Sequence, residues 1–293
     1  MTEEIGILLK GVGSFYEVLT DAGETITCKA RGLFRKEHTV PTVGDRVALE
    51  RQPQGYALLT RIFPRKNLLI RPPVANIDRI FLVVSASVPE PDWLLIDRMI
   101  LEAKRLGIDP VPVMNKVDTS GQEPIDLFLK EYREFRPLCV SAESGEGLDA
   151  LRSQLKGCVS CFAGQSAVGK SSLLNALFPE LHLAVGDLSA KTERGRHTTR
   201  HAELLPYENG AVLDTPGFSL WEAEPMEQPE LNKLYPEFAY APFCCRYPDC
   251  MHDTEPDCGV KALLESGELT AGRYERYLRI AREHQQRRKH RYD

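Results

Sequence analysis

The segment GQSAVGKS at residues 164–171 constrains the fold of this chain more than any other feature. It matches the pattern G-x-x-x-x-G-K-[ST], whose glycines let the backbone curl so that successive N–H groups point at phosphate oxygens. An apolar run typical of a buried strand precedes it, and one typical of a helix follows it. A glycine-rich turn with an exposed lysine is the alternative, but the flanking strand and helix favour a phosphate-binding loop in an α/β domain.

The residues of this loop have distinct expected roles. Lys170 is expected to reach the β and γ phosphates of a nucleotide, and Ser171 is expected to coordinate Mg²⁺ through its hydroxyl. The predicted nucleotide contacts in this segment are Gly164, Gln165, Ser166, Ala167, Val168, Gly169, Lys170, Ser171 and Ser172.

A second motif, NKVD at residues 115–118, follows an apolar run, and α/β sheets bind ligands at the carboxyl ends of their strands. Asp118 can accept hydrogen bonds from the N1–H and 2-amino groups of guanine, whereas adenine offers neither donor there. Asn115 and Lys116 are predicted nucleotide contacts with it. The motif is short, and Asp118 as the N-cap of a helix explains it equally well.

Two more short motifs end predicted strands. Ser141 and Ala142 place a backbone N–H where it can donate to guanine O6. Asp214 begins DTPG and is expected in the Mg²⁺ shell, with the Gly217 amide near the γ-phosphate; an ordinary proline-glycine turn is the alternative. Taken together, the four motifs predict GTP or GDP with Mg²⁺ as the ligands.

The order of these motifs is unusual. In the common GTPase order the phosphate loop comes first and the guanine motifs come last, but here Asn115 and Ser141 precede Gly164. The same strands can fill the same sheet positions when the old termini are joined and a surface connection is opened. The sequence therefore predicts a circularly permuted domain that is cut just after Gly217, so that the second switch runs into the C-terminal segment.

The arginine-rich segment between the phosphate loop and Asp214 has the length of a first switch. Thr198 or Thr199 is expected to complete the Mg²⁺ coordination, and the sequence does not separate the two. Phe218 follows DTPG where a water-orienting glutamine is usual, which predicts slow intrinsic hydrolysis, of order 10⁻⁴ s⁻¹. His197 is a candidate to orient the water, although a solvated loop histidine is the plainer interpretation. The predicted catalytic set is Lys170, Ser171, His197, Thr198 and Thr199.

A cysteine cluster near the C-terminus has metal-ligand spacing. Cys245, Cys250, His252 and Cys258 form C-x4-C-x-H-x5-C, which is enough for a closed tetrahedral zinc site without an open catalytic position. Cys244 is a spare thiol that could replace Cys245. An iron–sulfur site, which the histidine disfavours, and reduced cysteines without a metal are the alternatives.

The chain of 293 residues is long enough for two or three domains. Short β-like runs and turn signals in the first seventy residues predict a five-stranded barrel, and strands then alternate with helices as in a mostly parallel sheet. The predicted fold class is α/β. An OB-type barrel is expected over 1–72, a circularly permuted P-loop GTPase domain over 73–220, and a zinc-binding helical domain over 221–293.

Charge is unevenly distributed along the chain, whose net charge is −5. Residues 1–72 carry eleven Lys and Arg against eight Asp and Glu, and residues 273–293 carry eight against three. Two basic ends suit two contacts with a polyanion, although ordinary surface charge is the alternative. The last segment is predicted to form an amphipathic helix that packs through its tyrosines and displays Arg273, Arg276, Arg279 and Arg282.

No apolar run approaches the length of a membrane span, and the N-terminus MTEEIGILLK lacks a cleavable signal. We therefore expect a cytoplasmic protein that does not associate with membranes. The scattered cysteines are interpreted mainly as buried thiols.

These motifs together resemble the ribosome small-subunit-dependent GTPase A family, whose members are circularly permuted. The resemblance covers RGLFRK, VGDRV, RPPVANIDRIF, NKVD, GQSAVGKSSLLN, GRHTT, DTPGF and the cysteine cluster. It implies a barrel, a permuted GTPase domain and a zinc domain that act late in small ribosomal subunit assembly, with GTP hydrolysis stimulated by that subunit. Asp257 stands where a glycine is expected, which leaves the zinc ligands intact.

Two functional hypotheses follow. In the first, the chain is a monomeric GTPase that contacts the small ribosomal subunit and its rRNA through the barrel and the zinc domain. In the second, the chain is a binding module in which the nucleotide gates RNA attachment and turnover is incidental.

Overall fold

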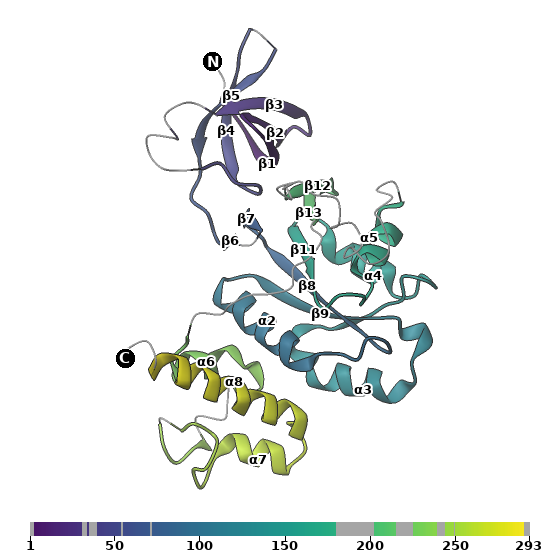
Figure 1. Ribbon diagram of the computed structural model, residues 1–293, viewed down its shortest axis with the longest axis vertical. Coiled ribbons are helices and arrows are strands. Elements are labelled where there is room, and N and C mark those ends of the chain that lie inside the picture. Colours follow the sequence, from purple (N-terminus) through teal and green to yellow (C-terminus); the bar gives the residue numbers. More distant parts are fainter. Residues whose placement is uncertain are drawn as a thin grey trace, which may run out of the picture.

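The computed structural model describes residues 3–30, 34, 40–53, 55–70, 72–179, 202–214, 225–238, 244–248 and 250–289 (Figure 1). Three units follow one another along the long axis of the molecule: an N-terminal barrel, a central sheet with helices on both faces, and a C-terminal helical unit. Within the described part of the chain, no helix combines the length and the apolar character that a membrane crossing requires.

The N-terminal unit is a closed five-stranded barrel, as the sequence predicts. Its strands are β1 (Glu4–Val12), β2 (Phe15–Thr20), β3 (Thr25–Ala30), β4 (Arg46–Arg51) and β5 (Ala57–Ile62). They close in the order β1-β2-β3-β5-β4, and only β3 and β5 pair in parallel among these neighbours. Side chains such as Leu8, Val18, Val47 and Leu59 are fully buried inside the barrel, because alternate residues of a strand face the same side.

A short hairpin leads from the barrel to the sheet. Strands β6 (Leu68–Ile70) and β7 (Pro73–Ala75) pair antiparallel, and Val74 also bridges to Val43 beside the barrel. The predicted domain boundary at residues 72 and 73 falls in the turn of this hairpin, and the one at residue 220 lies outside the described residues.

The central sheet has six strands in the order β10-β9-β8-β11-β13-β12. All neighbours are parallel except β12 and β13, which agrees with the predicted, mostly parallel sheet. The strands are β8 (Arg79–Ser85), β9 (Asp109–Asn115), β10 (Leu138–Cys139), β11 (Val159–Ala163), β12 (Glu203–Tyr207) and β13 (Gly210–Asp214).

Helices cover both faces of this sheet (Figure 1). On one face, α2 (Trp93–Arg105) and α3 (Gln122–Glu131) pack on Ile80, Leu82 and Val84. On the other face, α4 (Leu148–Leu155) and α5 (Lys170–Leu177) pack on Phe81 and Val83. Short 3-10 helices η1 (Val117–Thr119) and η2 (Arg133–Phe135) flank α3.

The C-terminal unit contains α6 (Gln228–Leu234), η4 (Pro236–Phe238), α7 (Gly259–Glu265) and α8 (Ala271–Lys289). Its core of buried Tyr235, Phe238, Tyr277 and Ile280 also takes in Leu101 from α2. The unit is therefore built onto the central domain through α2.

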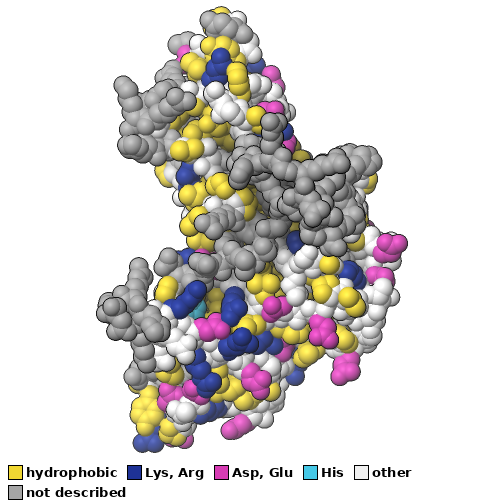
Figure 2. All heavy atoms as spheres, in the orientation of Figure 1, with side chains coloured by type: hydrophobic (Ala, Val, Ile, Leu, Met, Phe, Trp, Pro, Cys, Tyr) yellow, Lys and Arg dark blue, Asp and Glu magenta, His cyan; other side chains and the backbone are white. Residues whose placement is uncertain are grey.

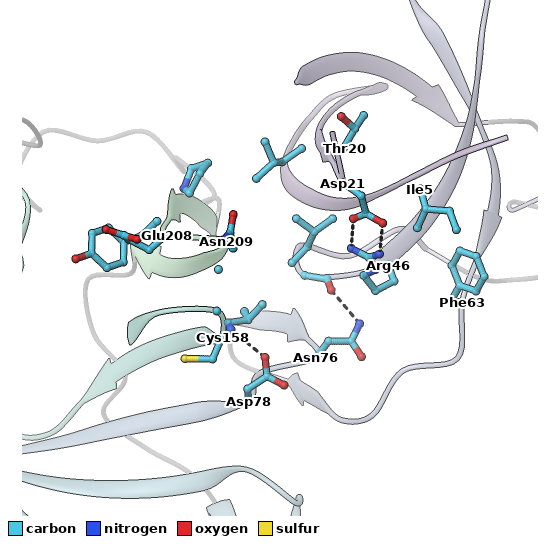
Figure 3. A pocket seen from close by; sticks show the side chains of 18 of the residues that line it. Ile5, Thr20, Asp21, Arg46, Phe63, Asn76, Asp78, Cys158, Glu208 and Asn209 are labelled. Carbon is cyan, nitrogen blue, oxygen red and sulfur yellow. Dashed lines mark hydrogen bonds and ion pairs between the residues drawn. The ribbon is translucent and has the colours of Figure 1, made fainter. Parts of the chain in front are cut away.

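The barrel lies against the opposite end of the sheet. Strand β1 contacts the edge strand β12, and Lys10 Nζ lies 3.0 Å from a carboxylate oxygen of Glu203. A pocket of about 920 Å³ separates the barrel from the neighbouring strand ends (Figure 3). Four of its charged side chains pair with one another, Arg46 with Asp21 at 2.8 Å and Lys66 with Asp78 at 2.8 Å, whereas Glu208 pairs with Lys156 outside the pocket.

Candidate nucleotide and metal sites

The predicted phosphate loop joins β11 to α5. Two of its glycines cannot be replaced without strain: a Cβ at Gly164 would lie 2.1 Å from the Val83 carbonyl oxygen, and one at Gly169 would lie 2.3 Å from Asn115 Nδ2. Both have positive φ, as does Ala167 at +64°. The loop therefore has the tight curl that the motif predicts, and it holds one alanine in a left-handed conformation.

Lys170 is the first residue of α5, and its side chain turns back over the loop. Its Nζ donates to the carbonyl oxygen of Gly164 at 2.8 Å and also to that of Gln165. Burial lowers the pKa of this ammonium. These contacts fix the charge at the mouth of the loop, where anionic phosphate oxygens would restore the solvation that burial removes.

The side-chain amide of Asn115 joins three of the predicted motifs. Asn115 ends β9 and is almost fully buried. Its Nδ2 donates to the Val168 carbonyl oxygen in the phosphate loop at 2.9 Å, and its Oδ1 accepts from the Ala142 N–H at 3.1 Å. One residue thus holds the loop against the Ser141–Ala142 segment, although these segments are far apart in the chain.

Lys116 makes a second connection between the same regions. It adopts a left-handed conformation with φ of +65°, and its Nζ donates to the carbonyl oxygens of Ala167 at 2.9 Å and Val88 at 2.6 Å. The phosphate loop, the NKVD segment and the loop between β8 and α2 are therefore tied together. The contact to Val88 has no signal in the sequence.

Asp118 lies in η1 with an exposed side chain. The N-cap of the following helix α3 is Gly121, so the interpretation of Asp118 as a helix cap is wrong. Its carboxylate is open to a ligand at the same end of the sheet as the phosphate loop. The buried Ser141 shapes the adjoining turn, since its Oγ accepts from the N–H groups of Glu143 and Ser144.

Asp214 ends β13, the strand next to β11, so its backbone is beside the strand that leads into the phosphate loop. The remaining predicted residues of the nucleotide site, His197, Thr198, Thr199 and Gly217, lie outside the described residues, as does Phe218.

The predicted metal ligands come together in the C-terminal unit. The ligand atoms of Cys245, Cys250, His252 and Cys258 all lie within 4.8 Å of one another. His252 Nδ1 is 3.3 Å from Cys258 Sγ and 3.7 Å from Cys245 Sγ, close to the roughly 3.5 to 3.8 Å edges expected around tetrahedral zinc. The spare thiol of Cys244 is exposed and lies outside this cluster.

The other nitrogen of His252 is also held. His252 Nε2 lies 3.1 Å from the side-chain amide of Asn232, and Tyr277 donates to the Oδ1 of the same Asn232 at 2.9 Å. Burial lowers the pKa of His252, which keeps the imidazole neutral, the form that binds metals. The three thiols and one imidazole therefore fit a closed structural metal site. The supporting role of Asn232 was not predicted from the sequence, because Asn232 lies twenty residues before His252 and outside the cysteine motif.

A phosphate loop bound to an NKxD segment on a mostly parallel sheet, with the two in permuted order, defines a circularly permuted guanine-nucleotide-binding protein. The family model described as RsgA GTPase matches residues 62–224, and that of the RsgA N-terminal domain matches residues 5–59. The chain belongs to the RsgA GTPase family and is a GTP-hydrolysing enzyme.

Relatives match over nearly the whole chain. The small ribosomal subunit biogenesis GTPase RsgA of Caldanaerobacter subterraneus subsp. tengcongensis is 42% identical over 292 residues, 98% of each chain. That of Geobacillus thermodenitrificans is 41% identical over 96% of this chain and 98% of its own. Two solved structures are similar: YjeQ from Thermotoga maritima, with a TM-score of 0.83 and 35% identity over 96% of this chain and 98% of its own; and YloQ, a circularly permuted GTPase, with a TM-score of 0.82 and 33% identity over 98% and 96%.

Proposed function

We propose that this chain hydrolyses GTP during the biogenesis of the small ribosomal subunit and that the subunit stimulates the hydrolysis. The observation that carries the proposal is the Asn115 amide, which binds the phosphate loop and the Ser141–Ala142 segment at once. This arrangement occurs in a chain 42% identical to a protein named for that process.

In this proposal the nucleotide lies across the carboxyl ends of β9, β10 and β11. Lys170 and the N–H groups of the loop bind the phosphates, and Asp118 binds the guanine edge. Mg²⁺ is coordinated by Ser171 and Asp214, with Thr198 or Thr199 completing its shell.

We further infer that hydrolysis is slow until the subunit binds. Phe218 cannot orient a water molecule, so a group from His197 or from the subunit must do so. A rate of order 10⁻⁴ s⁻¹ is expected for the chain alone.

The Cys₃His cluster is proposed to hold one structural Zn²⁺, because its donors are soft thiolates and an imidazole with no open position. The unit around it is small, so the metal would supply much of its folding free energy. We propose the domain limits that the sequence predicts, 1–72, 73–220 and 221–293. We also propose that the protein acts in the cytoplasm, where it would meet ribosomal subunits, and that it is a monomer.

Contact with rRNA is proposed for both ends of the molecule. On the barrel, Lys29 Nζ lies 5.0 Å from the ring centroid of Phe15, which is exposed, and 4.5 Å from that of Tyr56. Exposed aromatic rings beside a cation suit stacking with unpaired bases. On the other end, Figure 2 shows Lys and Arg side chains near Asp and Glu side chains on the face that carries α8. In α8, Arg279 and Arg282 are exposed but pair with Glu283 and Asp253.

GTP hydrolysis measured with and without purified small subunits tests the proposal. We expect a stimulation of tenfold or more. A stimulation below about threefold would favour the alternative, a binding module in which turnover is incidental.

A substitution tests the base site separately. Asp118→Asn should lose its preference for GTP over ATP and accept xanthine nucleotides, because the amide reverses one hydrogen bond. The matched control is Asp126→Asn on the exposed face of helix α3, which should bind GTP as the wild type does. An unchanged guanine preference in Asp118→Asn would remove Asp118 from the base pocket.

A further inference from the structure

The side chain of Gln165 joins the phosphate loop to the first turn of α2. Its Oε1 accepts from the backbone N–H of Asp92 at 2.9 Å, and Asp92 Oδ1 in turn caps α2 by accepting from the Leu95 N–H at 2.9 Å. The backbone carbonyl of Gln165 accepts from Lys170 Nζ. Gln165 therefore contacts both Lys170, which is proposed to bind phosphate, and the N-terminus of α2, which covers the face of the sheet opposite to α5.

Helix α2 has partners on two sides. Ile96, Met99 and Ile100 pack into the core that covers the sheet. Leu101 packs into the core of the C-terminal unit, and Arg98 Nη2 lies 2.7 Å from both carboxylate oxygens of Glu283 on α8. The helix is therefore shared by the two units.

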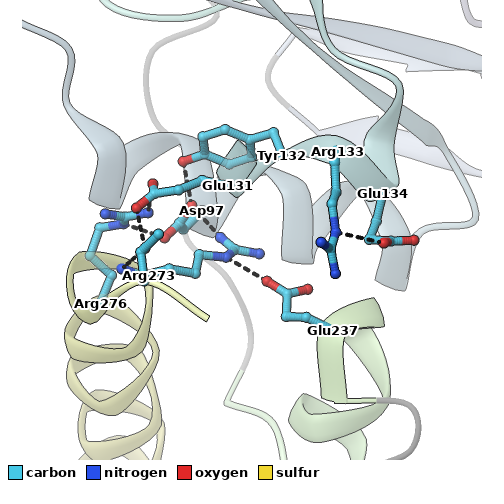
Figure 4. A network of polar contacts seen from close by, with 9 residues as sticks. Asp97, Glu131, Tyr132, Arg133, Glu134, Glu237, Arg273 and Arg276 are labelled. Atoms are coloured by element: carbon cyan, nitrogen blue, oxygen red, sulfur yellow. Dashed lines mark hydrogen bonds and ion pairs between the residues drawn. The ribbon is translucent and has the colours of Figure 1, made fainter. Parts of the chain in front are cut away.

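Buried charges reinforce this shared position (Figure 4). Asp97, fully buried in the middle of α2, pairs with Arg273 and with Arg276, whose Nε is 2.6 Å from Asp97 Oδ2. It also accepts from the Tyr132 hydroxyl at 2.7 Å. Arg276 continues to Glu131 at 2.7 Å.

The charges in this cluster depend on one another. Burial by itself would lower the pKa of Arg273, but Asp97 and Glu237 raise it well above its ordinary value, so the guanidinium stays charged. Bonds between buried charges are directional, and separating them leaves an unpaired charge in a medium of low dielectric constant. A shift of α2 must therefore carry Arg273 and Arg276 with it, and both belong to α8.

We propose that Gln165 is a positioning residue that couples the nucleotide at the phosphate loop to the placement of α8, through α2. Thirteen residues of regular helix span about 20 Å and transmit a small displacement of the first turn to Asp97, Arg98 and Leu101. Phosphate oxygens that draw on Lys170 act on the peptide of Gln165, and its side chain passes the change to Asp92. The inference rests on the proposed function only in requiring that the chain binds guanine nucleotide.

Amide hydrogen exchange of the full-length, metal-loaded chain tests this coupling, measured without nucleotide, with GDP and with a non-hydrolysable GTP analogue at saturating concentrations. In the wild type, nucleotide should slow exchange in α5, and it should change exchange in the first turn of α2 and in α8 by threefold or more. Gln165→Met keeps the length of the side chain without its acceptor. At saturation it should keep the α5 response and lose the α8 response.

Three comparisons make the result decisive. Gln165→Glu retains an acceptor for the Asp92 N–H and should keep the α8 response. Gln122→Met makes the same chemical change on the exposed start of α3 and should also keep it. A purely structural role for Gln165 would shift α8 exchange equally with and without nucleotide.

Two outcomes overturn the inference. One is a Gln165→Met chain whose α8 response stays within twofold of the wild type. The other is a wild-type chain in which α5 responds to nucleotide and α8 does not. If α5 itself fails to respond, nucleotide binding at the phosphate loop fails, and the proposed function falls together with the inference.

Discussion

The central sheet and the C-terminal unit reach a fixed structure by different means. In β8, five consecutive residues from Ile80 to Val84 are fully buried between two layers of helices, so apolar burial stabilises the sheet without any ligand. The C-terminal unit instead combines a small aromatic core with a Cys₃His cluster that could hold a metal ion and with a buried ionic cluster. From this difference we propose that the order of the attached unit depends on a bound metal and on paired charges, whereas the catalytic sheet needs neither.

The largest difference in stability between the two units is expected when metal is removed from the Cys₃His cluster. Because structural zinc contributes on the order of 10 kcal/mol in small zinc domains, Cys250→Ser or chelation should unfold residues 225–289. The sheet should stay folded and bind GTP. Limited proteolysis with a parallel nucleotide titration would report both, and Cys244→Ser, outside the cluster, is the control. A C-terminal unit that resists proteolysis after complete metal removal would show that it folds without the metal and would contradict the prediction.

Breaking the ionic cluster should have the next largest effect. Asp97→Asn leaves Arg273 and Arg276 buried with one carboxylate fewer, which costs about 3 to 5 kcal/mol. Denaturant unfolding followed by tryptophan fluorescence would detect the loss, since Trp93 stacks on Tyr132 at 6.0 Å.

The matched control for Asp97 is Asp253→Asn. It removes the pair with Arg282, whose side chain is 58% exposed, and should change the unfolding free energy by less than about 1 kcal/mol. Equal effects of the two substitutions would show that burial of the Asp97 cluster has no energetic consequence.

A pH-dependent contact of His284 should make the stability of the C-terminal unit, but not that of the central sheet, fall at acidic pH. His284 Nδ1 accepts from the Met226 N–H at 3.1 Å, and burial together with Arg287 and Arg288 lowers the pKa of His284. Below a pH of about 6.5, the unfolded chain binds a proton at this residue that the folded chain does not. Stability should therefore fall as the pH falls from about 6.5 to the lower folded pKa.

His284→Asn keeps an acceptor but cannot titrate, so it isolates this effect. Thermal midpoints of the wild type and His284→Asn should be measured from pH 7.5 to 5.5. As the pH falls, the midpoint of the wild type should decrease more than that of His284→Asn. A difference that does not vary with pH would refute the prediction.

The smallest effect is expected in the phosphate loop itself. Ala167 has a φ of +64°, which is unfavourable for alanine by about 1 kcal/mol, whereas glycine adopts it freely. Ala167→Gly should therefore stabilise the sheet domain by a few tenths of a kcal/mol, after the gain in unfolded-chain entropy is subtracted. Ala150→Gly on the exposed face of helix α4 should destabilise the domain by about 1 kcal/mol. Thermal unfolding of both variants would check the opposite signs.

Much of the site could be predicted from the sequence because its chemistry requires local spacing. Phosphate binding needs a contiguous curled backbone, and a tetrahedral metal site needs four donors on short loops. Residues 164–171 and the cysteine cluster can therefore be recognised from their residue spacing. The barrel and the alternation of strands and helices were likewise predicted from turn signals and apolar runs. The joint role of the Asn115 amide required the folded sheet, because nothing in a motif gives the partners of a side chain.

The C-terminal helix shows where such reasoning fails. The sequence predicted that its arginines are displayed on the surface, which holds for Arg279 and Arg282 but is wrong for Arg273 and Arg276. Helical periodicity identifies the faces of a helix. It cannot show that the carboxylate of Asp97, 179 positions upstream, pairs with Arg276.

The contact between β1 and β12 has a consequence for dividing the chain. Strand β12 is the outermost strand of the sheet, so one row of its backbone hydrogen-bonding groups has no neighbouring strand there. Strand β1 of the barrel lies against β12, and Lys10 pairs there with Glu203. A fragment that begins after residue 72 would lose the proposed RNA contact and the barrel that packs on β12. We expect that fragment to self-associate through the strand edge.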